Sequence, residues 1–188
     1  MTIELSEKEG KILREIARDY KTRYQLHQLL KVAADSTVHK ALKKLMKLEL
    51  IEVKREEPFP RIPGMNKKYF GVTFRGLIAA LKNDSVKLQQ IQQREELVTD
   101  WVKKVQKFDN ENKISQAFGI ESFSKDKRLQ ILQNHLIEEM KDCPPELEQF
   151  LKHYDLDYST DAMIFGEWVW HIVLRKGAGL VKLAGVGL

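Results

Sequence analysis

Apolar residues near the N-terminus recur at the spacing of a helix with one buried face. The residues of this face are Ile12, Leu13, Ile16 and Ala17. Ser6, followed three residues later by Glu9, is typical of a capping box at the start of a helix. The pattern therefore predicts a helix over residues 6–20.

Two further helices follow after short connectors. Thr22 is the expected N-cap of a helix over residues 22–31. Its inward positions are Leu26, Leu29 and Leu30. The third helix is expected to begin at a cap formed by Asp35 or Ser36 and to run through Leu48. Its apolar face consists of Val38, Ala41, Leu42 and Leu45, with Met46 and Leu48 at the margins. Two helices joined by a tight turn predict a helix-turn-helix.

The opposite face of the third helix is basic. It comprises Ser36, Lys40, Lys43, Lys44 and Lys47, with Thr37 and His39 at its flanks. Lysines with almost no acid among them gain little from ion pairs within the helix and repel one another, so this face favours an external anion. Considered alone, the same face is equally consistent with a solvated surface that binds nothing.

A two-stranded ribbon is predicted after the third helix. Residues 50–54 alternate like a half-buried strand, and residues 68–72 form its expected antiparallel partner. The segment between them is rich in proline and favours a loop over residues 55–67. Three helices followed by a ribbon with a long basic loop is the order of a winged helix-turn-helix domain. The residues expected on the wing or at its base are Arg61, Asn66, Lys67 and Lys68.

The rest of the chain also has helical patterns. Thr73 is the expected cap of a helix over residues 74–83, and the chain breaks at Asp84 and Ser85. A long amphipathic helix is predicted over residues 86–108, and its apolar seam needs a partner helix from this chain or from a second copy. The seam consists of Ile91, Val98, Trp101, Val105 and Phe108. Three further helices are expected over residues 125–141, 145–154 and about 160–176.

These patterns predict a mainly α-helical fold with a small antiparallel β-wing. A winged helix-turn-helix domain is expected over residues 1–83, and a helical region for dimerisation or sensing over residues 84–188. Charge follows the same division. Residues 1–82 contain 18 Lys and Arg against 10 Asp and Glu, whereas residues 83–188 contain 14 against 17. A basic module joined to a slightly acidic one is typical of nucleic-acid binding, because clustered cations neutralise phosphates.

Other classes of function receive little support. No nucleophile, glycine-rich phosphate loop or oxyanion motif accompanies the carboxylate pairs at residues 138–139 and 155–157, so we expect no enzyme. The spacings of Cys143, His135, His153 and His171 match no metal-binding unit, so neither a metal nor another cofactor is expected. A single cysteine, no signal-peptide pattern and no apolar membrane-spanning stretch favour a cytoplasmic location without a membrane partner.

Residues 36–81 resemble the winged-helix transcription regulators of the PadR and MarR type. The matching stretches are residues 36–45, 50–53 and 67–77, the last being the strongest. With the two preceding helices, the resemblance covers residues 5–81. It implies that the third helix is the recognition helix and that the protein is a homodimer whose C-terminal helices pair. Glu49 stands where these families usually place a glycine that ends this helix, which leaves the geometry of the exit open. His39 stands where PadR-like sequences commonly have tyrosine.

We therefore predict a transcription regulator that binds double-stranded DNA in a sequence-specific manner, as a homodimer. Residues 36–48 are expected in the major groove, and the wing over residues 55–68 on the backbone or in the minor groove. The residues nearest the bases are Ser36, Thr37, His39, Lys40 and Lys43. The expected phosphate contacts are Lys44, Lys47, Thr22, Arg23 and Tyr24. The alternative is a winged-helix module that binds proteins and no DNA. A small-molecule or protein effector at the C-terminal region stays open.

Overall fold

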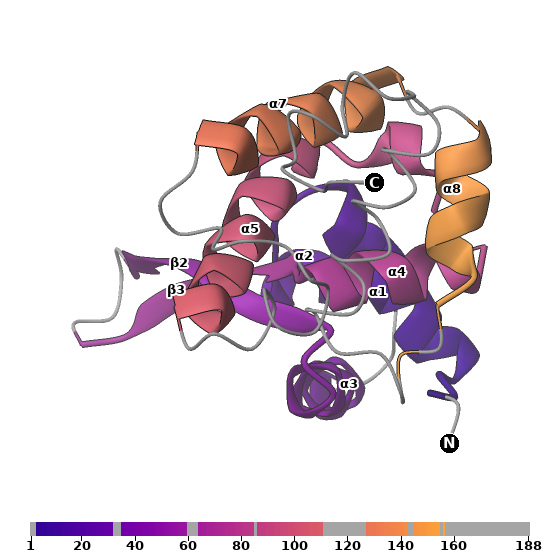
Figure 1. Ribbon diagram of the computed structural model, residues 1–188. Helices are drawn as coiled ribbons and strands as arrows, with labels where there is room; N and C mark the ends of the chain where they lie inside the picture. The colour runs from indigo at the N-terminus through magenta and orange to yellow at the C-terminus, as the bar shows by residue number, and fades with distance from the viewer. Residues whose placement is uncertain are drawn as a thin grey trace. The chain divides into compact units, whose positions relative to one another are not determined.

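The computed structural model describes residues 3–31, 35–59, 64–84, 86–110, 127–142, 145–154 and 156 of the chain (Figure 1). The chain forms two compact units. The first consists of Met1–Gln93 and Pro145–His153, and the second of Arg94–Pro144 and Tyr154–Leu188. The first unit thus continues past the predicted boundary at residue 83 and includes a helix from the C-terminal half.

Helix α1 (Glu7–Arg18) forms as its sequence predicts. The Ser6 hydroxyl accepts a hydrogen bond from the Glu9 N–H at 3.4 Å, and the Glu9 carboxylate accepts one from the Ser6 N–H at 2.8 Å. The capping box is therefore confirmed. Its four predicted apolar residues are all buried, as Ile12, Leu13, Ile16 and Ala17.

Helices α2 (Arg23–Leu30) and α3 (Asp35–Lys47) form the predicted helix-turn-helix. The Thr22 side chain caps α2, and Leu26 is buried. The expectation that Leu29 faces inward was wrong, because its side chain is 55% exposed. The buried side of α2 is centred on Leu26 and lies toward the half-buried His27 and Leu30, so that Leu29 falls outside it.

A small antiparallel sheet completes the first unit. Its strands are β1 (Lys21–Thr22), β2 (Ile51–Pro58) and β3 (Asn66–Val72), in the order β1-β3-β2. Strand β1 pairs Lys21 with Phe70 and Thr22 with Tyr69, and sequence patterns did not predict it because two residues carry no periodicity. Helix α1, strand β1, helices α2 and α3 and the hairpin β2–β3 together form a winged helix-turn-helix, which confirms the predicted fold class. Figure 1 shows the hairpin extending away from the helices.

The wing strands are longer than predicted. Residues assigned to a loop are paired instead, with a register shift between Val53 and Arg55. The additional pairs are Arg55 with Tyr69, Glu56 with Lys68, Glu57 with Lys67 and Pro58 with Asn66. Opposite charges that face each other across two strands stabilise this pairing. Pro58 is tolerated because it occupies the last position of its strand.

Helix α3 ends at Glu49 in the left-handed conformation, with φ of 56°. The Leu50 N–H donates to the Leu45 carbonyl at 2.9 Å, and the Glu49 N–H donates to the Met46 carbonyl at 3.0 Å. These two bonds form a Schellman motif, in which glycine usually occupies the left-handed position. The Thr73 hydroxyl donates to the Glu49 carbonyl at 2.6 Å and helps to hold this conformation. The exit therefore has the geometry that a glycine would give.

Helix α4 (Phe74–Lys82) follows the wing and fills the centre of the first unit. Thr73 caps it, as predicted, by accepting a hydrogen bond from the Gly76 N–H at 3.0 Å. Phe74 and the residues from Gly76 to Leu81 are buried. Helix α4 packs against α1 and against α8 (Pro145–Lys152). Gly76 permits a close approach to the chain at Leu50, where a β-carbon would lie 1.8 Å from the carbonyl oxygen.

The predicted helix over residues 86–108 was wrong in its first part. The structure has a short 3₁₀ helix, η1 (Leu88–Gln90), and then a turn. The α-helix itself, α5, spans Arg94–Asn110. The predicted break at Asp84 is confirmed, since this residue has a φ of 50°.

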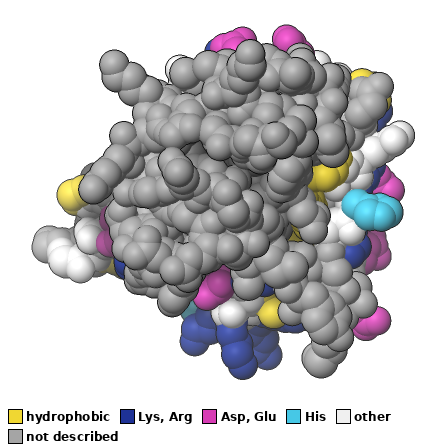
Figure 2. Space-filling model, viewed as in Figure 1, with side chains coloured by type: hydrophobic (Ala, Val, Ile, Leu, Met, Phe, Trp, Pro, Cys, Tyr) yellow, Lys and Arg dark blue, Asp and Glu magenta, His cyan; other side chains and the backbone are white. Residues whose placement is uncertain are grey.

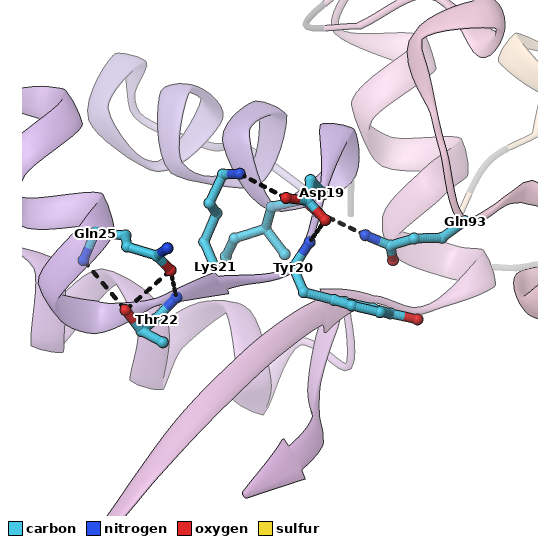
Figure 3. Close-up of polar contacts among 7 residues, drawn as sticks. Asp19, Tyr20, Lys21, Thr22, Gln25 and Gln93 are labelled. Atoms are coloured by element: carbon cyan, nitrogen blue, oxygen red, sulfur yellow. Dashed lines mark hydrogen bonds and ion pairs between the residues drawn. The ribbon is translucent and has the colours of Figure 1, made fainter. Parts of the chain in front are cut away.

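The burial of residues 86–93 explains this difference. Val86, Leu88 and Ile91 are all buried, and residues two apart cannot share one face of an α-helix. The Gln93 side chain donates a hydrogen bond to the Ile16 carbonyl at 3.4 Å and so anchors this segment at the end of α1 (Figure 3). The predicted helix therefore begins only after this anchor.

In the second unit, α5 packs against α7 (Lys127–Asp142). Val98, Trp101, Leu136 and Met140 are buried, and Lys141 lies 3.0 Å from the carboxylate of Glu95. The final predicted helix, over about residues 160–176, lies outside the described residues. None of the helices that the structure describes is long and apolar enough to cross a membrane.

Candidate nucleic-acid interface

Helix α3 has one buried face and one exposed basic face, as its sequence predicts. The buried face consists of Val38, Ala41, Leu42 and Leu45, which pack in the core of the first unit. Ser36, Lys40, Lys43 and Lys47 are exposed along the opposite line of the helix. Figure 2 shows Lys and Arg side chains gathered at the lower edge of the view, where Figure 1 places α3. We call Lys40, Lys43 and Lys47 the α3 lysine face.

No carboxylate in the described part of the chain forms an ion pair with the α3 lysine face. Lys40 and Lys43 are three residues apart, and Lys43 and Lys47 are four apart, so their side chains are neighbours on the helix surface. Like charges at these spacings repel one another. A polyanion that lies along the helix would relieve this repulsion.

Lys44 differs from these three lysines. Its ammonium lies 2.8 Å from the Glu9 carboxylate of α1 and 3.5 Å from the Glu4 carbonyl. Burial raises the pKa of Glu9, but hydrogen bonds from Lys44 and from Ser6 outweigh it and leave this pKa below its ordinary value. Lys44 therefore ties α3 to the start of α1, a contact that the sequence analysis did not foresee when it assigned Lys44 to phosphates.

The remaining predicted residues of α3 lie at the sides of the basic face. Thr37 is half-buried, whereas His39 is exposed. Met46, which the sequence placed at the margin of the apolar face, is 43% exposed. The structure thus brings most of the predicted base-contacting residues onto one accessible side of a single helix.

The start of α2 presents fewer groups than predicted. The Thr22 side chain is buried, and its hydroxyl accepts from the Gln25 N–H at 3.2 Å and donates to the Gln25 side chain at 3.0 Å (Figure 3). Thr22 is therefore engaged as a helix cap. Arg23 is exposed, and Tyr24 is 69% exposed, with its hydroxyl accepting a hydrogen bond from Gln28 at 2.7 Å.

One face of the wing stem is neutralised by Glu56. The carboxylate of Glu56 lies 3.2 Å from the Lys68 ammonium and accepts a hydrogen bond from the Asn66 side chain at 3.0 Å. These hydrogen bonds, Asn66 first and then Lys68, lower the pKa of Glu56. Two of the predicted DNA contacts, Asn66 and Lys68, thus already have an acidic partner within the chain.

The other face of the stem is organised around Tyr69. The Lys67 ammonium donates to the Tyr69 hydroxyl at 2.6 Å, and this hydroxyl donates to the Glu57 carboxylate at 2.8 Å. The Arg55 guanidinium lies over the Tyr69 ring at 4.1 Å and 3.5 Å from Glu57. The fourth predicted wing residue, Arg61, lies outside the described residues.

No family model matches the chain, and no curated protein matches it. One similar solved structure is Bacillus subtilis PadR in complex with operator DNA. It is 18% identical, and the match covers 76% of this chain and 96% of that chain, with a TM-score of 0.32. The interface described above is drawn from the residues of this chain alone.

The five residues of the predicted dimerisation seam do not form one stripe. Ile91 is buried in the first unit, whereas Val98 and Trp101 are buried residues of the second. The side chains of Val105 and Phe108 lie outside the described residues. A homodimer that uses this seam would have to expose side chains that are buried within one chain.

Proposed function

We propose that the first unit binds double-stranded DNA with α3 in the major groove, and that the protein acts as a transcription regulator. The observation that carries this proposal is the α3 lysine face. Its three cations stand on a rigid helix, are exposed to solvent and have no acidic partner in the described part of the chain. An α-helix about 10–12 Å across fits a major groove about 12 Å wide.

The residues of α3 have different roles in this arrangement. Ser36, Thr37 and His39, near the start of the helix, carry hydroxyl and imidazole groups that hydrogen-bond to base edges. Lys40 and Lys43 reach bases or the adjacent phosphates, and Lys47 reaches phosphates. Arg23 and Tyr24 at the start of α2 are further candidates for phosphate contacts, because helix N-termini favour anions.

A homodimer with one α3 in each of two half-sites is part of the same proposal. The C-terminal helices are its expected contact, through surfaces other than the buried Val98 and Trp101. Sedimentation of the purified chain with and without duplex tests this arrangement. A strictly monomeric chain that binds a single half-site would remove the dimer and leave the DNA contact intact.

The double variant Lys40→Ala/Lys43→Ala tests the DNA contact. Each phosphate contact contributes about 0.9 to the slope of log affinity against log salt, so two lost contacts reduce affinity by about 60-fold at 0.1 M salt. The measurement is fluorescence anisotropy of a labelled random-sequence duplex. The matched control, Lys87→Ala/Lys104→Ala, removes the same charge from exposed lysines outside α3 and is expected to bind like the parent.

Equal binding by the parent and by Lys40→Ala/Lys43→Ala would refute this assignment. Binding to no duplex at low salt would instead favour a winged-helix module that docks a protein. Circular dichroism of both variants shows whether they keep the helical content of the parent. The substitutions are at exposed positions, so we expect no change.

A further inference from the structure

The wing stem carries its cations in close pairs with carboxylates. Lys68 is 3.2 Å from Glu56, and Lys67 is linked through the Tyr69 hydroxyl to Glu57. Four charged residues that face each other across β2 and β3 therefore sum to no net charge. The α3 lysine face, in contrast, has three cations without an acidic partner among the described residues.

We infer that Glu56 and Glu57 set how strongly the wing binds duplex DNA, by cancelling the attraction of Lys67 and Lys68 for phosphates. The inference rests on the proposed function of α3. It assigns to the two glutamates the role of limiting sequence-independent binding, so that most affinity comes from the helix in the major groove.

Two features of the geometry make this cancellation effective. An exposed ion pair is weak, and a phosphate could displace Glu56 from Lys68 at little cost. The displaced carboxylate would still be fixed on β2 within a few ångströms of that phosphate, and like charges at this distance repel. Attraction and repulsion then largely offset each other, whichever anion holds the ammonium.

Tyr69 fixes the second pair more firmly. Its ring is 8% exposed, with the Arg55 guanidinium 4.1 Å and the Lys67 ammonium 4.7 Å from its centre. The hydroxyl joins Lys67 to Glu57 through bonds of 2.6 Å and 2.8 Å. A lysine held in this way loses more than an exposed one when it turns toward DNA, because two hydrogen bonds break and the ring contact is lost.

The experiment compares Glu56→Gln/Glu57→Gln with the parent on a labelled random-sequence duplex. Glutamine keeps the size of the side chain and its acceptor oxygen but removes the charge. Two cations freed for phosphates would each raise affinity by about 8-fold at 0.1 M salt and steepen the salt slope by about 0.9. The matched control Glu52→Gln/Glu95→Gln makes the same change in net charge, at one residue of β2 paired with the nearly buried Lys54 and one residue of α5.

A second pair of variants separates this inference from a general effect of charge. Lys67→Ala/Lys68→Ala in the parent is expected to change affinity less than 2-fold, because the two lysines contribute little while the glutamates remain. In the Glu56→Gln/Glu57→Gln background, the same lysine substitutions are expected to abolish the gain.

Either of two results would overturn the inference. One is an unchanged affinity in Glu56→Gln/Glu57→Gln, or a gain no larger than that of the control. The other is a large loss of binding in Lys67→Ala/Lys68→Ala, which would show that the wing cations already bind phosphates. Failure of the proposed function looks different, since the parent would then bind no duplex and only Lys40→Ala/Lys43→Ala would be uninformative.

Discussion

Replacing Gly76 with alanine tests the contact that fixes α4 against the end of α3. A β-carbon at this position would lie 1.8 Å from the Leu50 carbonyl oxygen and 2.8 Å from the Leu50 carbonyl carbon. Ordinary contact begins at 3.4 Å, so one backbone segment has to move by the difference, about 1.6 Å. Neither segment moves easily, because Leu50 is fully buried and α4 lies in the core.

The expected loss follows from three contributions. Overpacking of a core costs about 1–3 kcal/mol, and an obstacle made of backbone belongs at the upper end of that range. The shift also weakens the hydrogen bond from the Thr73 N–H to the Leu50 carbonyl, which is 3.1 Å long and contributes about 1 kcal/mol. Alanine returns about 1 kcal/mol through its higher helix propensity. The free energy of unfolding of Gly76→Ala should therefore fall by about 3 kcal/mol.

Urea unfolding followed by circular dichroism measures this change, and hydrogen exchange of peptides from β2, β3 and α4 locates it. The comparison variant is Ala80→Gly, which makes the reverse exchange in the same helix and should lower stability by about 1 kcal/mol through propensity alone. A Gly76→Ala protein as stable as the parent, or more stable, would refute the reasoning.

Three further predictions concern stability. Glu49→Gly should raise the free energy of unfolding by up to about 1 kcal/mol, because glycine removes the left-handed strain and the exposed ion pair with Arg75 contributes little; a lower urea midpoint would contradict this. Trp101→Ala should lower it by about 3–5 kcal/mol, with faster hydrogen exchange in α5 and α7, since this indole is 1% exposed; unchanged exchange would contradict it. Hydrogen bonds, one of them from Lys44, leave the pKa of Glu9 lowered, so its contribution is present at neutral pH and is lost as pH falls through that lowered pKa. The stability difference between the parent and Glu9→Gln should accordingly shrink in acid, and a constant difference would show that the charge is irrelevant.

The elements predicted most accurately are those whose signals are local. Helix α1 has a capping box and four apolar residues at one spacing, and its predicted core residues are all buried. The basic face of α3 follows from the same periodicity. Glu49 is informative because its position, one residue beyond the end of α3, requires a left-handed conformation even without glycine.

The differences arise where tertiary contacts decide. Strand β1 is two residues long and exists only because β3 lies beside it. The wing strands extend through Arg55, Glu56 and Glu57 because residues of β3 pair with them across the hairpin, which no periodicity within either segment indicates. The turn before α5 depends on the contact of Gln93 with α1, far away in the sequence. For the same reason, the partners of Lys44, Lys67 and Lys68 became apparent only in the structure.

Lysine footprinting tests the role of the α3 lysine face most directly. The purified chain is acetylated with and without a saturating duplex at low salt, and labelling rates are read at each lysine by mass spectrometry. We predict that Lys40, Lys43 and Lys47 are protected by the duplex, while Lys87 and Lys104 keep their rates. Unchanged labelling of α3 under conditions where the duplex is bound would contradict the account, because DNA would then occupy another surface.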